Sequence, residues 1–140
     1  MDLDACVQNR RSCKFYRRKN VPLDLIGEVL DAGTFAPSAA NLQNWEFIVV
    51  TDHAKREDIS HACLKQTWMI DAPVHIVICN DQKRVTPLFP ERGRLYSSQA
   101  CALACQNMML KAEDLGLGSC WVGGFDADAI RRLLNIPSGL

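Results

Sequence analysis

The sequence has no excess of charge of either sign. Sixteen lysines and arginines balance 16 aspartates and glutamates, so the formal net charge at pH 7 is zero. A protein that binds a long stretch of nucleic acid needs a strongly basic face, because phosphate contacts dominate its affinity. The balanced charge therefore argues against a nucleic acid partner, and no basic run is repeated along the chain.

Long hydrophobic runs are also missing. A membrane-spanning helix needs about 20 consecutive apolar residues, and no stretch of this chain approaches that length. The first residues, MDLDACVQNRR, begin with acidic side chains and lack the apolar core of a secretion signal. These two absences predict a cytoplasmic protein with no membrane partner.

Histidine is scarce, and the cysteines lack the spacing of metal ligands. The chain has three histidines and seven cysteines, without a Cys-x-x-Cys pair. Cys101 and Cys105 lie one helical turn apart, but zinc and iron–sulfur sites need more ligands at matching spacing. We interpret most of the cysteines as small buried apolar residues in a reducing compartment, and we expect no metal site.

The composition is sufficient for one folded domain. The 140 residues are 48% hydrophobic and 23% charged, as is typical of a globular protein. No repeat, low-complexity tract or linker divides the chain, so we expect residues 1–140 to form a single domain.

Local patterns predict helices that alternate with short strands. Pro22 suits the first position of a helix that ends near Gly33, and Asp52 and Asp126 are suited to cap two later helices. The helix from Gly93 is apolar around much of its circumference, which predicts burial by its own chain or by a second one. We predict helices over 2–8, 22–33, 53–64, 93–115 and 127–134, and strands over 45–50, 74–79 and 119–122. This order indicates a mixed α/β or α+β layer fold.

Three stretches carry residues suited to ligand binding. Residues 10–19 contain six cations, which indicates either a solvated basic loop or a site for one phosphate group. Residues 36–43 form a polar turn, stiffened by Pro37, that leads directly into an apolar strand. Residues 115–125, LGLGSCWVGGF, contain glycines that let the backbone approach a flat ligand. Their spacing and helix-to-strand order do not match the dinucleotide-binding fingerprint.

Taken in order, RRSCK at 10–14, APSAANLQNWEFIVV at 36–50 and LGLGSCWVGGF at 115–125 resemble the nitroreductase family of FMN-dependent oxidoreductases. The likeness covers nearly the whole chain. It implies an α+β fold with a central mixed β-sheet flanked by helices, in an intertwined homodimer with FMN at its interface. The long helix from Gly93 would then build the dimer core, which accounts for its apolar width.

The resemblance also implies which residues contact FMN. The basic motif would hold the phosphate and part of the ring's polar edge, and the turn would come from the other subunit and pack on the flavin. The WVGG backbone would lie near the reactive N5 side of the ring. The implied residues are Arg10, Arg11, Ser12 and Lys14, then Pro37, Ser38, Ala39, Asn41 and Gln43, and finally Val122, Gly123 and Gly124. No acid–base side chain is implied, because the cofactor carries the chemistry.

Several features depart from the family's usual pattern. Asn44 stands where the family usually has proline, which predicts a looser turn. Lys65 and Gln66 are the nearest candidates for a flavin contact that often precedes the second strand, and neither is assigned. The chain ends at Leu140, where members usually continue into a strand that pairs with the partner, so it is either a short member or lacks a tail. The short segment 80–92 predicts a more open substrate site.

The activity implied by the resemblance is transfer of reducing equivalents from NAD(P)H, through FMN, to a nitroaromatic compound, a quinone or a related acceptor. Other uses of the same fold stay open, namely a flavin reductase or a reductive dehalogenase-like enzyme. A non-catalytic flavin-binding module also stays open, and a metal or redox-thiol protein is the least favoured alternative. NADH, NADPH and a reduced protein are all possible electron donors.

Overall fold

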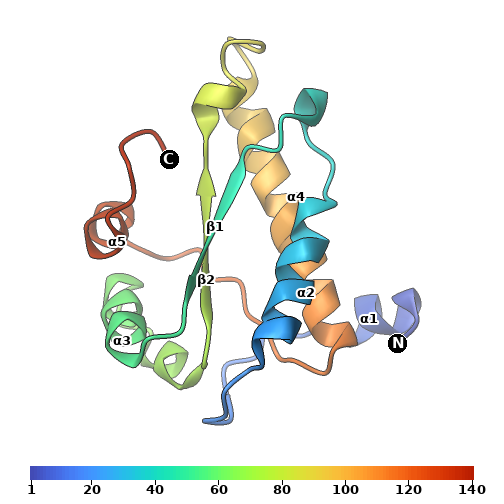
Figure 1. Cartoon of the computed structure of the whole chain (residues 1–140), viewed down its shortest axis with the longest axis vertical. Helices are drawn as coiled ribbons and strands as arrows, with labels where there is room; N and C mark the ends of the chain where they lie inside the picture. Colours follow the sequence, from blue (N-terminus) through green and yellow to red (C-terminus); the bar gives the residue numbers. More distant parts are fainter.

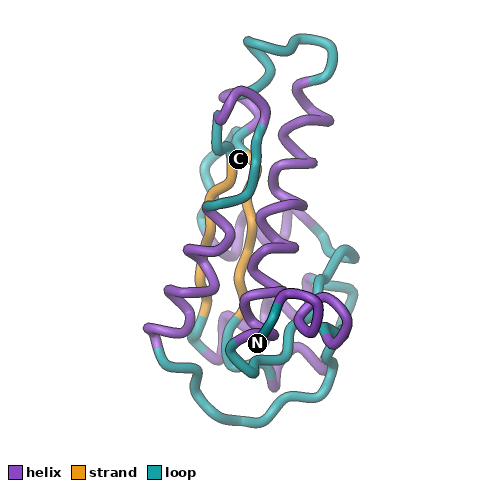
Figure 2. The backbone as a smooth tube through the Cα atoms, turned by 90° about the vertical axis from the view of Figure 1, so that its right-hand side faces the viewer, coloured by secondary structure: helices purple, strands orange, loops and turns teal.

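A two-stranded antiparallel sheet lies in the middle of this computed structural model, with helices on both faces (Figure 1). The strands pair along their full lengths, from Trp45 opposite Asn80 to Val50 opposite His75. Figure 2 shows that the strands run along the long axis of the molecule. The structure describes all 140 residues: helices α1 (Leu3–Asn9), α2 (Leu23–Thr34), α3 (His53–Ala62), α4 (Gly93–Asp114) and α5 (Ala127–Leu134), strands β1 (Trp45–Val50) and β2 (His75–Asn80), and short 3-10 helices at Ala39–Asn41, Thr67–Asp71 and Gln82–Arg84.

The helix ends confirm several predictions made from local chemistry. Asp52 caps α3 by accepting the Lys55 N–H at 2.9 Å, and Asp126 caps α5 by accepting the Ala129 N–H at 3.0 Å. Gly116 follows α4 with φ at +73°, a conformation in which glycine is not strained. The helix boundaries differ from the predicted ones by one or two residues at most ends.

Helix α2 ends one residue after Gly33, which confirms an end near this glycine, but Gly33 itself lies inside the helix. The helix continues through Thr34, and Gly33 is buried where α2 meets α4. An added Cβ at Gly33 would lie 2.9 Å from Cγ of Met108 and 3.1 Å from Cζ of Phe47. The missing side chain therefore serves the close approach of two helices rather than a turn.

The sheet is smaller than the predicted mixed sheet. The predicted strand at 119–122 forms only one isolated parallel bridge, between Ser119 and Ser12. Glycines flank this segment on both sides and disfavour an ordered strand, because glycine loses more backbone entropy than other residues. The prediction of a mixed sheet is wrong, since both strands of the sheet are antiparallel.

The hydrophobic core occupies both faces of the sheet. On one face, Val50 packs with Ile59 of α3 and Ile130 of α5. On the other face, Trp45 packs with Ala100 and Ala104 of α4, whose small side chains allow a close approach. Apolar side chains of β2 contact both sets of helices.

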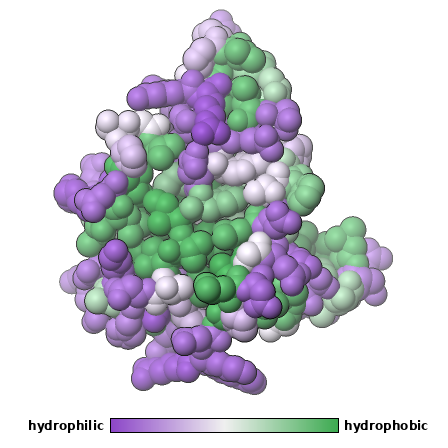
Figure 3. Space-filling model, viewed as in Figure 1, coloured by the Kyte–Doolittle hydropathy of each residue, from purple (hydrophilic) through white to green (hydrophobic).

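The chain exposes more surface than a compact monomer of its mass. Its accessible area is 8679 Å², whereas a 15.6 kDa protein is expected to expose about 7,300 Å². Figure 3 shows hydrophobic residues gathered over the middle of one face. Further exposed apolar side chains include Leu3 and Val7 on α1 and Leu95 and Leu103 on α4. None of the helices has both the length and the apolar character that a membrane crossing requires.

Candidate functional site

The basic segment 10–14 lies beside the glycine-rich segment 115–125, although the two are far apart in the sequence. The backbone N–H of Cys13 donates to the carbonyl oxygen of Ser119 at 2.9 Å. Gly118 permits this contact, because a Cβ there would lie 2.9 Å from Sγ of Cys13. The structure therefore brings two of the three predicted ligand-binding stretches together.

The connection between α3 and β2 completes this cluster. Nε2 of Gln66 donates to the carbonyl oxygen of Gly124 at 3.3 Å. The ring of Trp68 stacks on that of Tyr16, with centroids 6.4 Å apart, and lies 5.6 Å from Nζ of Lys14. Sequence reasoning raised Gln66 without assigning it and missed both aromatic residues, because a lone aromatic side chain carries no signal for its partner.

Hydrogen bonding holds the backbone of the basic segment in place. The Tyr16 hydroxyl donates to the carbonyl oxygen of Cys13 at 2.6 Å. Burial raises the pKa of Tyr16 well above its usual value, and the neighbouring thiols of Cys13 and Cys120 add to the shift. The phenol therefore remains a protonated donor at all ordinary pH values.

The cations of this segment are not neutralised by carboxylates. Arg10, Arg11 and Lys14 form no ion pair within the chain. Arg11 donates only to nearby backbone carbonyl oxygens, and the side chains of Ser12 and Lys14 are exposed. Unpaired cations next to a free hydroxyl suit an anionic group such as a phosphate.

The turn at 36–43 holds three non-glycine residues in the left-handed region of backbone space. Ala40, Asn41 and Gln43 have φ values of 50°, 54° and 47°, and each such conformation costs about 1 kcal/mol or more. Oγ of Ser38 accepts the Gln43 N–H at 3.0 Å and closes the turn. Strained backbone of this kind gathers at binding sites, and the assigned contacts of this turn stay a prediction.

Asn44 ties this turn to the core, contrary to the expectation of a loose turn. Only 1% of its surface is exposed. Its Nδ2 donates to Oδ1 of Asn80 at 2.8 Å and to the carbonyl oxygen of Ser97 at 3.0 Å. One amide thereby joins the start of β1 to the end of β2 and to α4, so the prediction is wrong.

The turn and the basic segment lie toward opposite ends of the sheet (Figure 1). The turn directly precedes Trp45 at the start of β1, while Trp68, beside the basic segment, packs on the cluster that contains Val50 at the other end. The six residues of β1 alone span about 17 Å. A single chain therefore does not bring all three predicted stretches together.

The cysteines and histidines are not arranged as a metal site. No group of three or more histidine, cysteine, aspartate or glutamate side chains is arranged to hold a metal ion, and all seven cysteines are free. Burial raises the pKa of Cys101 and of Cys105 to about 11. Both thiols are therefore protonated near neutral pH, which makes them poor metal ligands and poor nucleophiles.

Known proteins match this chain along nearly its whole length. A family profile described as "Nitroreductase family" matches residues 7–68 and 57–140. A protein of Methanothermobacter thermautotrophicus named as an NADH dehydrogenase/NAD(P)H nitroreductase is 36% identical over 98% of this chain and 71% of its own length. An iodotyrosine deiodinase of Thermotoga neapolitana is 26% identical over 96% of this chain and 80% of its own. The solved structure of an FMN-dependent nitroreductase from Clostridium difficile superposes with a TM-score of 0.83 at 29% identity, over 97% of this chain and 80% of that one.

Proposed function

Because this chain belongs to the nitroreductase family, we propose that it is an FMN-dependent oxidoreductase that transfers reducing equivalents from NADH or NADPH to a nitroaromatic compound, a quinone or a related acceptor. FMN supplies the redox chemistry when bound, and the protein binds, orients and shields it. The observation that carries the proposal is the junction of segments 10–14 and 115–125, joined by the Cys13–Ser119 hydrogen bond.

The residues at this junction fit FMN by their chemistry. Arg10, Arg11 and Lys14, which lack carboxylate partners, would hold the phosphate and the polar edge of the ring together with Ser12. A Cβ at Gly123 would meet no atom within 4 Å, so this backbone is open to a flat ligand. The backbone groups of Val122, Gly123 and Gly124 would supply the remaining contacts.

We further propose a homodimer in which the turn of each chain completes the site of the other. Pro37, Ser38, Ala39, Asn41 and Gln43 lie too far from the basic segment of their own chain to share one FMN with it. The excess of exposed surface and the exposed leucines of α4 support burial against a second copy. Each dimer would then contain two equivalent sites.

The visible absorption spectrum of the purified protein, followed by steady-state kinetics, tests this proposal. We expect a yellow protein that releases FMN at about one per chain. We also expect oxidation of NADH or NADPH that requires the flavin and an added acceptor. A colourless protein that takes up no added FMN would contradict the proposal, whereas bound FMN without turnover would favour a flavin-binding module.

Reductive dehalogenation is the second candidate, because the iodotyrosine deiodinase relative matches 96% of this chain. The same preparation distinguishes the two activities when a halogenated phenol replaces the nitroaromatic acceptor. Release of halide under reducing conditions, faster than nitroaromatic reduction, would favour dehalogenation. Reduction of added free FMN, with no preference for other acceptors, would instead indicate a flavin reductase.

A further inference from the structure

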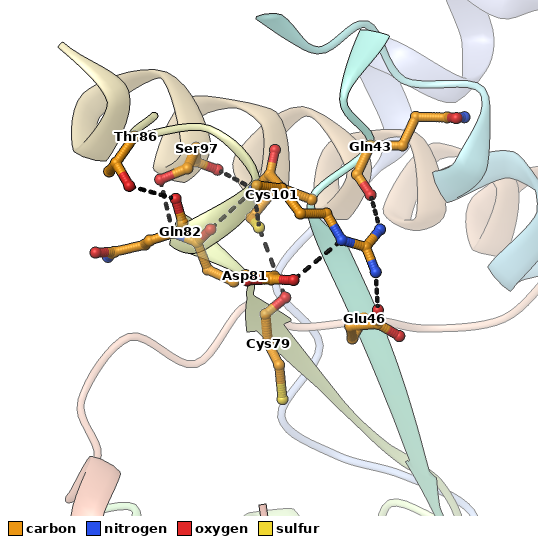
Figure 4. A network of polar contacts seen from close by, with 11 residues as sticks. Gln43, Glu46, Cys79, Asp81, Gln82, Thr86, Ser97 and Cys101 are labelled. Atoms are coloured by element: carbon orange, nitrogen blue, oxygen red, sulfur yellow. Dashed lines mark hydrogen bonds and ion pairs between the residues drawn. The ribbon is translucent and has the colours of Figure 1, made fainter. Parts of the chain in front are cut away.

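Arg84, in the connection between β2 and α4, holds the strained turn from outside. Its Nη1 donates to the carbonyl oxygen of Gln43 at 3.2 Å. The same guanidinium contacts Glu46 at 2.8 Å through Nη2 and Asp81 at 3.0 Å through Nε. Figure 4 shows these contacts, with the side chain of Gln43 pointing away from them.

The chemistry of arginine suits this position. A guanidinium has five N–H donors in a fixed planar fork, so one side chain binds several acceptors at once. The two carboxylates fix the guanidinium through Nε and Nη2, and Nη1 donates to the carbonyl of Gln43. That carbonyl belongs to a residue with φ at +47°, at the point where the turn joins β1. A lysine in the same place offers one compact ammonium and lacks the fork.

Asn44, the residue that follows Gln43, is anchored on the inner side of the turn. Its amide hydrogens bind Asn80, in a part-buried contact, and Ser97, in a buried one. The exit of the turn is thus fixed on its two sides, by a charged side chain at the surface and by a buried amide. The side chains of Asn41 and Gln43 are left exposed.

We infer that Arg84 and Asn44 are positioning residues, which hold the 38–43 turn in the conformation that presents Asn41 and Gln43 to a ligand. This inference rests on the proposed function, in which that turn contacts FMN bound to the partner subunit. Arg84 and Asn44 act through the turn. Residues of the 81–84 connection in one subunit therefore set the FMN affinity of the other subunit's site.

FMN titration of the apoprotein tests this role with matched variants. Arg84→Met removes the fork and keeps the aliphatic stem, and Lys83→Met removes a neighbouring exposed cation that has no ion pair. We expect Arg84→Met to raise the FMN dissociation constant about tenfold, as the loss of one charge-assisted hydrogen bond predicts. Lys83→Met leaves it unchanged. Arg84→Lys keeps the charge without the fork and shows most of the same loss.

Mixed dimers add a measurement that a merely structural role would not affect. One subunit carries Arg10→Ala and Arg11→Ala, and its partner carries Arg84→Met. If the turn serves the partner, one site of the mixed dimer combines an unaltered basic segment with an unaltered turn, and tight binding of one FMN returns. If the turn serves its own chain, both sites stay damaged and tight binding does not return.

The outcomes separate this inference from the proposed function. Failure of the unaltered protein to bind FMN overturns both. Normal FMN affinity in Arg84→Met overturns the positioning role and leaves the oxidoreductase proposal standing. Mixed dimers that regain no tight site overturn the assignment of the turn to the partner's site, and they also leave the oxidoreductase proposal standing. If Arg84→Met does not fold, Arg84→Lys takes its place in both experiments, with the same expected results.

Discussion

Arg56 of α3 is 9% exposed and has no carboxylate partner. Its guanidinium donates instead to three backbone carbonyl oxygens, two of them at Ile70 and Ala72. Nε2 of His75 lies 2.8 Å from the carbonyl oxygen of Met69 in the same connection. These buried groups fix the connection between α3 and β2. This connection contains Trp68, which contacts the basic segment. Nδ1 of the His75 imidazole is buried without a partner.

His75 gives the protein a pH-dependent stability. Burial lowers the pKa of His75 and the nearby Arg56 adds to the shift, against the opposing effect of the Met69 carbonyl. The unfolded chain therefore binds this proton first as the pH falls below about 6.5. The free energy of unfolding is unaffected by this group above that pH. Below it, the free energy falls by up to about 1.4 kcal/mol per pH unit until the folded protein also binds the proton.

Replacing His75 should remove this part of the pH dependence. We expect the loss of unfolding free energy between pH 7.5 and pH 5, measured by urea denaturation, to be smaller in His75→Gln than in the unaltered protein. The control is His61→Gln, at an exposed position of α3, which should keep the unaltered pH dependence. Equal losses in the two variants would contradict the assignment to His75.

At the scale of elements, glycines decide how closely segments pack. Gly93 begins α4 against the backbone of the preceding connection, and an added Cβ would lie 2.8 Å from Cα of Thr86. Gly27, on the exposed face of α2, has no neighbour within 4 Å of such an atom. Residues of the same type thus have opposite roles in two helices.

The same substitution at these two glycines should change stability in opposite directions. Gly93→Ala should lower the free energy of unfolding by about 1–3 kcal/mol, because backbone atoms of Thr86 must move. Gly27→Ala should raise it by about 0.5–1 kcal/mol, because alanine favours an exposed helix position. Urea denaturation of both variants at one pH measures the difference. A Gly93→Ala variant with a higher free energy of unfolding would contradict the prediction, because the connection would then move without loss of stability.

At the scale of the whole molecule, a site divided between two chains explains the exposed apolar surface. Leu103 of α4 remains 44% exposed, although Ala100, Ala104 and Ala112 of the same helix are buried. The sequence predicted a helix that is buried widely by its own chain or by a second one. In the structure, the helix is partly buried by its own chain. In the proposed dimer, a second copy would bury its exposed side chains.

A charge on the outer face of α4 should separate the proposed dimer. We expect Leu103→Glu to sediment as a 15.6 kDa monomer under conditions where the unaltered protein sediments at twice that mass. FMN affinity should fall in parallel, because a monomer lacks the partner's turn. Ala54→Glu adds the same charge to the exposed surface of α3 and should leave the mass unchanged. A dimeric Leu103→Glu would place the interface elsewhere.

The sequence by itself determined the family, the helices and the two strands, because caps, glycines after helices and apolar periodicity act within a few residues. Asp52 and Asp126 acted as predicted. It also determined the basic and glycine-rich motifs as candidates, since their composition does not depend on the fold.

Only the tertiary structure decided which of these segments meet. It placed Ser119 beside Ser12 with a single bridge in place of a strand, and it buried Asn44 between two strands and α4. It also brought Arg84 to the carbonyl of Gln43. Each of these contacts joins residues that are distant in sequence, and their geometry depends on how whole elements pack, which no local pattern contains.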